Sequence, residues 1–405
     1  MNMFNVAKHI GKKKEDEEEE LLCLWKGKDV VNKSSCLCVQ WSTDGQSVAA
    51  GGSDGLVRMF DGKTGQFKGC LSEPPKDTGK LMDIINAGTD TLPIMALRWH
   101  PKQAGRIRVA SSSGTIELLE ASKKRVLQTT KEVDTMSTPT PNKPNTTLCI
   151  DYSADGSTWA SGGTDKIVRV YDESQPKAPK VELRGSLAGD PGHNNRICAV
   201  RICKGNPSLI ASAGLDGTAL LWDTSGASGP RNAPMTHISD VDVRGDALDF
   251  DACDRLLTGS WRPGNQLQIW DVRSGKCEVG ISWKKKPPPP VEAFPVQGKS
   301  SKGLWTKVRD VVKGSSNVYT CQYIGRGALL GGIVAGGTGR CELKVFTAAK
   351  EADGGVHTPI GSIQIPGGVQ GLHVAPNNAD RIAVAATDGT VYCVQMPNKP
   401  PKRAE

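Results

Sequence analysis

The chain has 405 residues, with 51 lysines and arginines against 43 acids and a formal net charge of +8. A chain of this length exceeds one ordinary hydrophobic core, so it forms either several domains or one closed repeat architecture. Aromatic residues make up only 5%, whereas 46 glycines and 25 prolines punctuate the sequence. This composition argues against a helical bundle and indicates many short strands joined by turns.

The N-terminus and the cysteines indicate the compartment. No apolar run approaches the roughly 20 residues that cross a bilayer, and residues 12–20 are lysines followed by acids, without an apolar signal segment. We therefore expect a cytoplasmic protein with no membrane span, in which the twelve cysteines are reduced thiols. The sequence contains no C-x-x-C and no paired-histidine motif, so we expect neither a metal nor a cofactor.

One pattern recurs along the chain. It consists of an alternating apolar strand, a polar turn, a strand of small residues, a tight turn, and another alternating strand that ends in an aromatic residue and an aspartate. In the first copy the strands are residues 36–41, 47–51 and 56–61. Further copies begin at residues 95, 148, 197, 247, 318 and 369. These copies predict seven similar antiparallel sheets.

The ends of the copies carry a family resemblance. They include Trp222 with Asp223 and Trp270 with Asp271. Because of these endings, residues 21–396 resemble a WD-repeat β-propeller. The resemblance implies an all-β fold, a seven-bladed β-propeller of four-stranded antiparallel blades around a central channel. Prolines follow the seventh copy, so we expect residues 21–25 to pair beside residues 390–396 and close the ring with an N-terminal strand.

A hydrogen-bond relay stabilises blades of this family. It links a histidine before the blade, a serine or threonine on the second strand, an aspartate in the next turn, and the tryptophan. The fourth copy matches it in full, with His193, Ser212, Asp216 and Trp222. The resemblance therefore implies that His193 has a structural role.

Three long insertions, residues 72–93, 130–146 and 284–316, connect the last strand of one blade with the first strand of the next. The turns between first and second strands, and between third and fourth strands, read as short. In a propeller the inter-blade connections all lie on one face, which we call the insertion face and predict to contact partners. Residues 1–20 are expected to form a charged, disordered tail, with a short amphipathic segment as the alternative, and residues 397–405 form a C-terminal tail.

The third insertion is strongly basic. Residues 284–314 contain eight lysines and arginines against two acids, most of the chain's excess charge. A run of four prolines holds the lysines extended and solvated, where they can meet an acidic partner. A solvated linker is the alternative. The candidate partner-binding residues are Lys284, Lys285, Lys286, Phe294, Lys302, Trp305 and Arg309.

The sequence favours binding over catalysis. It contains neither a P-loop nor a G-x-S-x-G motif, and no carboxylate pair suited to acid–base chemistry is evident. We therefore expect no enzyme activity, no catalytic residue and no small-molecule substrate. The resemblance implies a scaffold or adaptor for protein–protein interactions within a multiprotein complex. The lysines favour a partner with an acidic surface, such as the tubulin tails of the cytoskeleton or the cilium.

Three alternatives stay open. A substrate receptor of a cullin-type ubiquitin ligase is one, because Arg273 follows Asp271 at the spacing that such receptors use. A nucleic-acid-associated protein ranks lower, since the basic insertion offers only Phe294 and Trp305 for stacking on bases. A propeller enzyme is the third.

Overall fold

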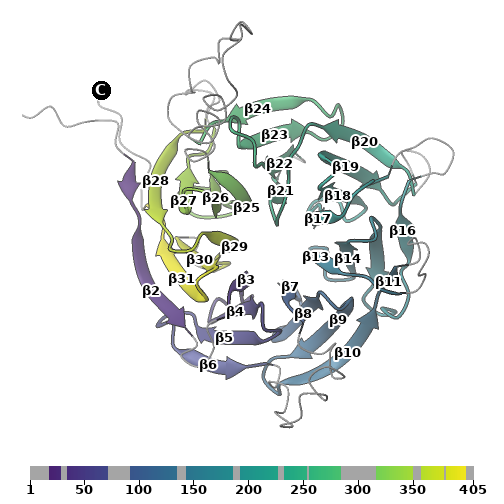
Figure 1. The fold of residues 1–405 in the computed structure, drawn as a ribbon, viewed down its shortest axis with the longest axis horizontal. Coiled ribbons are helices and arrows are strands. Elements are labelled where there is room, and N and C mark those ends of the chain that lie inside the picture. Colours follow the sequence, from purple (N-terminus) through teal and green to yellow (C-terminus); the bar gives the residue numbers. More distant parts are fainter. Residues whose placement is uncertain are drawn as a thin grey trace, which may run out of the picture.

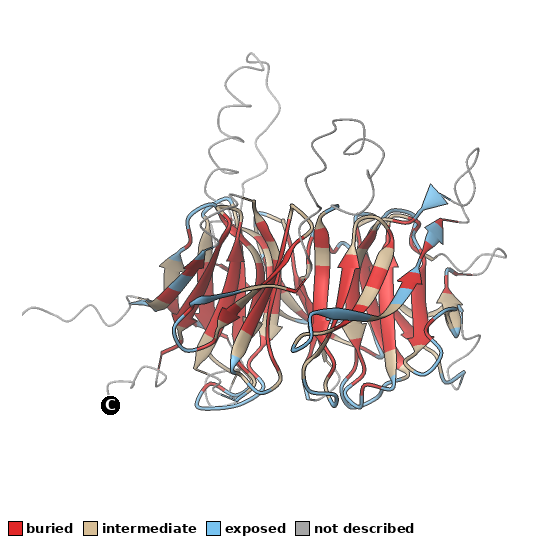
Figure 2. Cartoon of the chain, turned by 90° about the horizontal axis from the view of Figure 1, so that it is seen from below, coloured by how far each residue is buried: buried red, intermediate tan, exposed pale blue. Residues whose placement is uncertain are grey.

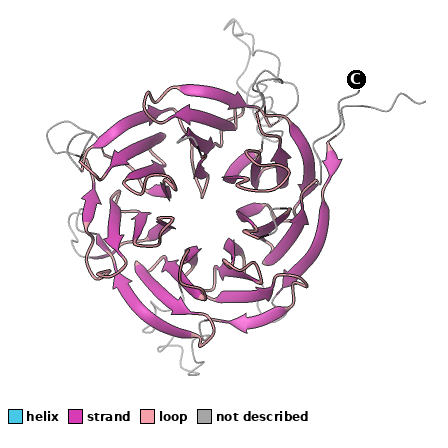
Figure 3. Cartoon of the chain, turned by 180° about the vertical axis from the view of Figure 1, so that it is seen from behind, coloured by secondary structure: helices cyan, strands magenta, loops and turns pink. Residues whose placement is uncertain are grey.

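Seven blades stand around a central channel, as Figures 1 and 3 show from opposite sides. The computed structural model describes residues 18–28, 34–71, 92–134, 143–185, 192–226, 232–252, 255–283, 316–349, 357–377 and 380–397. Within these ranges the chain forms strands and turns and no helix, so none of the described residues belongs to a helix able to span a membrane. The predicted all-β, seven-bladed propeller is confirmed.

The strands of each blade run antiparallel in order from the channel outward. Blade 1 contains β3 (Cys36–Trp41), β4 (Ser47–Gly52), β5 (Val57–Asp61) and β6 (Phe67–Cys70). Blade 2 contains β7 (Ile94–Trp99), β8 (Arg106–Ser111), β9 (Thr115–Glu120) and β10 (Arg125–Lys131). Blade 3 contains β13 (Thr147–Tyr152), β14 (Thr158–Gly163), β15 (Val168–Asp172) and β16 (Val181–Leu183). Blade 4 contains β17 (Ile197–Ile202), β18 (Leu209–Gly214), β19 (Thr218–Asp223) and β20 (Pro234–Ser239).

The remaining blades complete the ring. Blade 5 contains β21 (Leu248–Phe250), β22 (Arg255–Gly259), β23 (Leu267–Asp271) and β24 (Cys277–Ile281). Blade 6 contains β25 (Asn317–Tyr323), β26 (Ile333–Thr338), β27 (Glu342–Phe346) and β28 (Pro359–Gln364). Blade 7 contains β29 (Val369–Val374), β30 (Arg381–Ala386), β31 (Thr390–Gln395) and the N-terminal strand β2 (Leu22–Lys28).

The hydrophobic core lies between neighbouring blades, and the exposed residues gather at the turns (Figure 2). Second strands such as β4 consist of small residues, because the next blade crosses them closely. A Cβ atom at Gly51 would lie 2.6 Å from Cγ2 of Ile94 in blade 2, and one at Gly162 would lie 2.8 Å from Cγ2 of Ile197 in blade 4. The small residues that mark each repeat are therefore the contact points between blades.

The N-terminal strand closes the ring as predicted. β2 pairs antiparallel with β31, with Leu22 opposite Gln395 and Trp25 opposite Cys393. The buried Trp25 ring also meets the edge of Trp41 in blade 1, and its indole N–H donates to the carbonyl of Gly62 at 3.2 Å. The closing strand thus completes blade 7 by covering the outer edge of β31, and it packs against blade 1 through Trp25.

The propeller begins earlier than the predicted boundary at residue 21. β1 (Glu19–Glu20) pairs parallel with β28 of blade 6. Both carboxylate oxygens of Glu18 lie 2.7 Å from Nζ of Lys344 on β27. The last acids of the expected N-terminal tail therefore belong to blade 6. The rest of that tail, residues 1–17, and most of the C-terminal tail, residues 398–405, lie outside the described residues.

The insertions differ from the prediction in two respects. In the second, β10 runs on to Lys131, and β11 (Val133–Asp134) pairs with β12 (Lys143–Pro144), so its base is a two-stranded ladder and not a loop. On the opposite face, the connections from β19 to β20 and from β27 to β28 are also long, which corrects the expectation of uniformly short turns there. Residues 72–91, 135–142 and 284–315 lie outside the described residues.

Candidate functional site at the central channel

Side chains near the ends of the innermost strands link neighbouring blades around the channel. At five junctions a side chain accepts the backbone N–H of a residue on the next blade. These bonds run from Trp99 to Gln40 (3.2 Å), Ile202 to Asp151 (3.0 Å), Tyr323 to Asp249 (2.8 Å), Val374 to Gln322 (2.9 Å) and Trp41 to His373 (3.1 Å). Because no backbone ladder joins separate blades, this inner ring of hydrogen bonds sets their spacing.

The equivalent positions in blades 2 and 4 hold Arg98 and Arg201. Arginine has no acceptor, so neither can receive an N–H from the next blade. Their guanidinium groups instead meet Asp246, which precedes β21: Arg98 Nη2 lies 2.8 Å from Oδ2, and Arg201 Nη1 lies 2.7 Å from Oδ1. Arg98 Nε also lies 3.1 Å from Oδ1 of Asp151. We call these four residues the channel cluster.

Electrostatics keeps the channel cluster charged. Burial alone would raise the pKa of Asp246, but Arg201 and Arg98 outweigh it, and this pKa lies well below its ordinary value. Burial would likewise lower the pKa of Arg201, but Asp246 and Asp151 raise it above its ordinary value. Two cations therefore face two anions across the channel.

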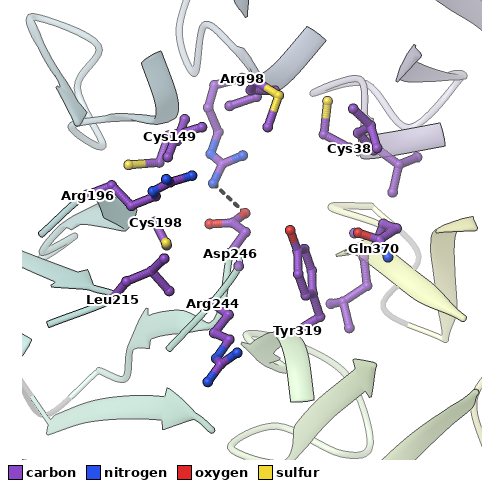
Figure 4. A pocket seen from close by; sticks show the side chains of 18 of the residues that line it. Cys38, Arg98, Cys149, Arg196, Cys198, Leu215, Arg244, Asp246, Tyr319 and Gln370 are labelled. Atoms are coloured by element: carbon purple, nitrogen blue, oxygen red, sulfur yellow. Dashed lines mark hydrogen bonds and ion pairs between the residues drawn. The ribbon is translucent and has the colours of Figure 1, made fainter. Parts of the chain in front are cut away.

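The channel cluster lies between two cavities, since Arg98 and Asp246 line both. The cavity on the insertion face, which we call the channel mouth, has a volume of about 370 Å³ and is lined by the beginnings of the innermost strands (Figure 4). The cavity on the opposite face measures about 420 Å³. In Figure 4 Arg98 and Asp246 reach toward each other, with Arg196, Arg244 and Tyr319 around them.

Three cysteines line the channel mouth. Burial raises the pKa of Cys38 to about 12 and that of Cys198 to about 11, and it raises the pKa of Cys149 well above its ordinary value. These thiols stay protonated at neutral pH, which makes them weak nucleophiles and weak metal ligands. Across the described ranges, no group of three or more His, Cys, Asp or Glu side chains is placed to hold a metal ion.

His373 gives the inner ring a pH dependence. Its burial, together with the charges of Arg98, Lys204 and Arg201, lowers its pKa to about 3 from 6.5. Between those two values the unfolded chain binds a proton that the folded chain does not, so the free energy of unfolding decreases as the pH falls through this window. The limit for one proton is about 1.4 kcal/mol per pH unit, and the partial exposure of His373 keeps its contribution below that limit.

We therefore expect His373→Gln to make stability less dependent on pH between 6.5 and 4. Glutamine keeps the acceptor for Trp41 N–H, and the chain already uses it at Gln40 and Gln322. The measurement is urea denaturation at several pH values. His237→Gln, an exposed histidine on β20, serves as the control. Equal slopes in His373→Gln and wild type would contradict this role.

In blade 4 the four relay residues lie in one chain of hydrogen bonds. Trp222 Nε1–H donates to Ser212 Oγ at 2.8 Å, Ser212 Oγ lies 2.8 Å from His193 Nε2, and His193 Nδ1 lies 2.9 Å from Asp216 Oδ2. Because the Asp216 carboxylate can only accept, His193 donates to it from Nδ1, and in the neutral imidazole Nε2 then accepts from the Ser212 hydroxyl. Both imidazole nitrogens are occupied within the fold.

In blade 3 a glutamate occupies the place of the relay histidine. Glu132, only 3% exposed, comes from the base of the second insertion. Its Oε1 accepts from the hydroxyls of Ser161 and Tyr171, the latter at 2.9 Å. Its Oε2 accepts from Asn145 Nδ2 at 3.0 Å and Thr147 Oγ1 at 2.8 Å. No role for Glu132 was predicted from the sequence. The feature that indicates a different relay in blade 3 is Tyr171, which replaces the relay tryptophan.

The predicted partner-binding residues lie within residues 284–315, outside the described residues. The structure does show where this segment begins. Trp283 is 2% exposed, and its Nε1–H donates to Glu342 Oε2 at 2.7 Å while its ring meets the edge of Phe346. Trp283 thus fixes the start of the basic insertion at the junction of blades 5 and 6.

The channel residues were not predicted either. Their one sequence signal is positional, because each of them, Asp249 included, stands just before the last residue of an innermost strand. Asp246 has no such signal.

Comparison with known proteins identifies the repeat. A family model described as "WD domain, G-beta repeat" matches residues 23–61, 140–172 and 185–223. The chain therefore contains WD repeats. The matched segments cover strands of blades 1, 3 and 4 together with β2, and so include both the histidine relay and the blade that uses Glu132 instead.

WD-repeat proteins also appear among its relatives. Methylosome protein WDR77 of Xenopus laevis is 31% identical over 158 residues, 39% of this chain and 39% of that protein. Protein SPA1-RELATED 4 of Arabidopsis thaliana is 26% identical over 40% of this chain and 19% of that protein. A guanine nucleotide-binding protein subunit beta of Solanum tuberosum is 33% identical over 24% of this chain and 28% of that protein. The chain thus matches well under half of each relative.

A solved structure supports the fold. A chain in the crystal structure of the mitotic checkpoint complex superposes with a TM-score of 0.66 at 13% sequence identity, covering 98% of each chain. At that identity the likeness concerns the propeller alone. The WD-repeat relatives suggest a scaffold for protein interactions.

Proposed function

We propose that this WD-repeat propeller is a non-catalytic scaffold that binds protein partners on its insertion face. The observation that carries the proposal is the channel mouth, a cavity on that face whose ionised lining residues are Arg98, Arg196, Arg244 and a single aspartate, Asp246. A recessed cavity with surplus positive charge suits an acidic segment of another protein.

The state of the channel carboxylates supports binding over turnover. Asp151 and Asp246 are held by arginines, and Asp249 accepts the backbone N–H groups of Phe250 and Tyr323. Groups committed in this way stabilise the ring and are not poised as acids or bases.

Two insertions are anchored to the propeller where they begin, and this supports the insertion face as the docking surface. Glu132 ties the second insertion to blade 3, and Trp283 ties the start of the third to blade 6. An insertion that is anchored to the rigid propeller starts from a fixed point, and a partner therefore meets it at a reproducible position.

The specific version of this proposal is a cytoplasmic protein of the cytoskeleton or cilium whose Lys284, Lys285 and Lys286 meet the acidic tails of tubulin. We expect the triple substitution of these lysines by glutamate to weaken co-sedimentation with microtubules by about tenfold at low salt, since attraction becomes repulsion. The measurement is a pelleting assay against microtubule concentration.

Two controls sharpen this experiment. Lys102→Glu, Lys123→Glu and Lys177→Glu together make the same change of charge at exposed positions on the opposite face, and should leave pelleting unchanged. Microtubules trimmed of their acidic tails should bind wild type as poorly as intact ones bind the 284–286 variant. Undiminished pelleting of that variant would remove the tubulin proposal and leave the scaffold role.

A further inference from the structure

We propose that the channel mouth binds a glutamate side chain of an extended acidic peptide, with Arg196 and Arg244 as the contact residues. This inference rests on the proposed scaffold function and names the site and the chemistry of its partner. It uses residues on the propeller body itself, separate from the basic insertion.

Charge is the first argument. Asp246 is the one ionised acid in the lining, and it is compensated by Arg98 beside it and by Arg201 from the opposite side. Arg196 is exposed, and its guanidinium forms no ion pair within the described residues. Arg244 is exposed as well, and among the described residues its one ion pair is with Asp242, Nε to Oδ1 at 2.9 Å. Arg196 therefore leaves a positive charge at the mouth that a carboxylate can neutralise, and Arg244 offers a second guanidinium beside it.

Shape is the second argument. The channel cluster forms the floor, so a ligand enters from the insertion face and stops at Arg98 and Asp246. The wall between floor and rim is largely apolar and includes Leu37, Leu148 and Leu215. A cavity of about 370 Å³ accommodates a side chain and its adjoining backbone. The carboxylate of glutamate meets the rim arginines, and the adjoining peptide backbone lies along the apolar wall.

Trp261 supplies a third argument. It lines the mouth, and the guanidinium of Arg244 lies over its ring, 4.6 Å from the ring centroid. The ring of Trp261 therefore holds the Arg244 guanidinium beside the channel mouth, where a carboxylate can meet it.

The test uses the full-length chain and a fluorescein-labelled peptide of six glutamates with blocked ends, followed by fluorescence anisotropy. We expect Arg196→Glu and, separately, Arg244→Gln to weaken binding by about tenfold or more. Arg273→Glu, an exposed arginine in the turn after β23 on the opposite face, should leave affinity unchanged. A six-glutamine peptide should not bind. Arg196→Ala repeats the test without charge reversal, and thermal melting verifies that each variant is folded.

Several outcomes separate this inference from the proposed function. If the 284–286 glutamate variant loses the peptide while Arg196→Glu and Arg244→Gln retain it, the basic insertion is the acidic-peptide site and the channel-mouth inference is overturned, while the scaffold proposal stands. If wild type does not bind hexaglutamate, the inference fails, whatever the microtubule experiment shows. If a six-nucleotide RNA binds the mouth more tightly than hexaglutamate, with the same dependence on Arg196, the partner is a nucleic acid and the peptide proposal is wrong.

Discussion

Glu132→Ala should lower the free energy of unfolding by about 4 kcal/mol, because it removes a buried carboxylate that accepts four hydrogen bonds. The hydroxyls of Ser161 and Tyr171, the amide of Asn145 and the hydroxyl of Thr147 would all lose their partner in blade 3. The measurement is guanidinium denaturation followed by tryptophan fluorescence.

A neighbouring charge increases this effect. Arg169 is 3% exposed, and its Nη1 lies 3.9 Å from Glu132 Oε2. Burial lowers the pKa of Arg169, but Glu132 and then Asp165 raise it above its ordinary value, so the guanidinium stays charged. Without Glu132 this buried cation loses one of three nearby carboxylates and keeps Asp165, 2.6 Å from its Nη2, and Glu182, 3.4 Å from its Nε.

The matched control is Glu120→Ala at the end of β9. Glu120 pairs with Lys123 and Arg125 on the surface, so its removal should leave the denaturation midpoint unchanged. Glu132→Gln should lie between wild type and Glu132→Ala, because the amide keeps one acceptor oxygen. If Glu132→Ala unfolds at the wild-type denaturant midpoint, the hydrogen bonds of Glu132 do not stabilise blade 3.

Asp246→Ala should destabilise the protein by about 2–3 kcal/mol, since it leaves Arg98 and Arg201 facing each other without their shared carboxylate. The loss is below the roughly 3–5 kcal/mol of a fully buried pair, because the Asp246 side chain is 33% exposed. Equilibrium denaturation measures it. Asp240→Asn, at an 84% exposed partner of Arg262 in the same connecting segment, is the control and should have no effect, because asparagine removes the charge and tolerates the positive φ of 70° at this position.

The same substitution changes the response to acid. The folded-state pKa of Asp246 is below its ordinary value, so the stability it contributes is present above the ordinary aspartate range and is lost as the pH falls through that range and below it. Asp246→Ala should therefore unfold at acid pH with a shallower dependence than wild type. An equally steep acid limb would show that Asp246 does not contribute through its charge.

Several features of this protein could be predicted from the sequence because they depend on residues that are close to one another along the chain. Alternating apolar residues and polar turns recur in every blade, most second strands are rich in small residues, and six of the seven repeats supply all four strands of their own blade. The closing strand was predictable for a different reason: blade 7 lacked an outer strand, and residues 21–25 at the other end of the chain had an unassigned apolar pattern, which β2 accounts for. The blade 4 relay residues were identified because the family pattern places all four at fixed offsets around one blade.

The functional surface depends on a different kind of contact. Arg98 and Asp246 are 148 positions apart in the sequence, and Glu132 and Tyr171 are 39 positions apart. No periodic pattern in the sequence predicts that either pair is in contact. The repeat pattern determined that this chain is a closed ring of seven sheets, because six sheets are built from local pairing and the seventh repeat lacks one strand, which the N-terminus supplies. Tertiary structure alone decided which side chains meet at the channel, because the innermost strands of distant blades converge there and place unrelated residues within hydrogen-bond distance.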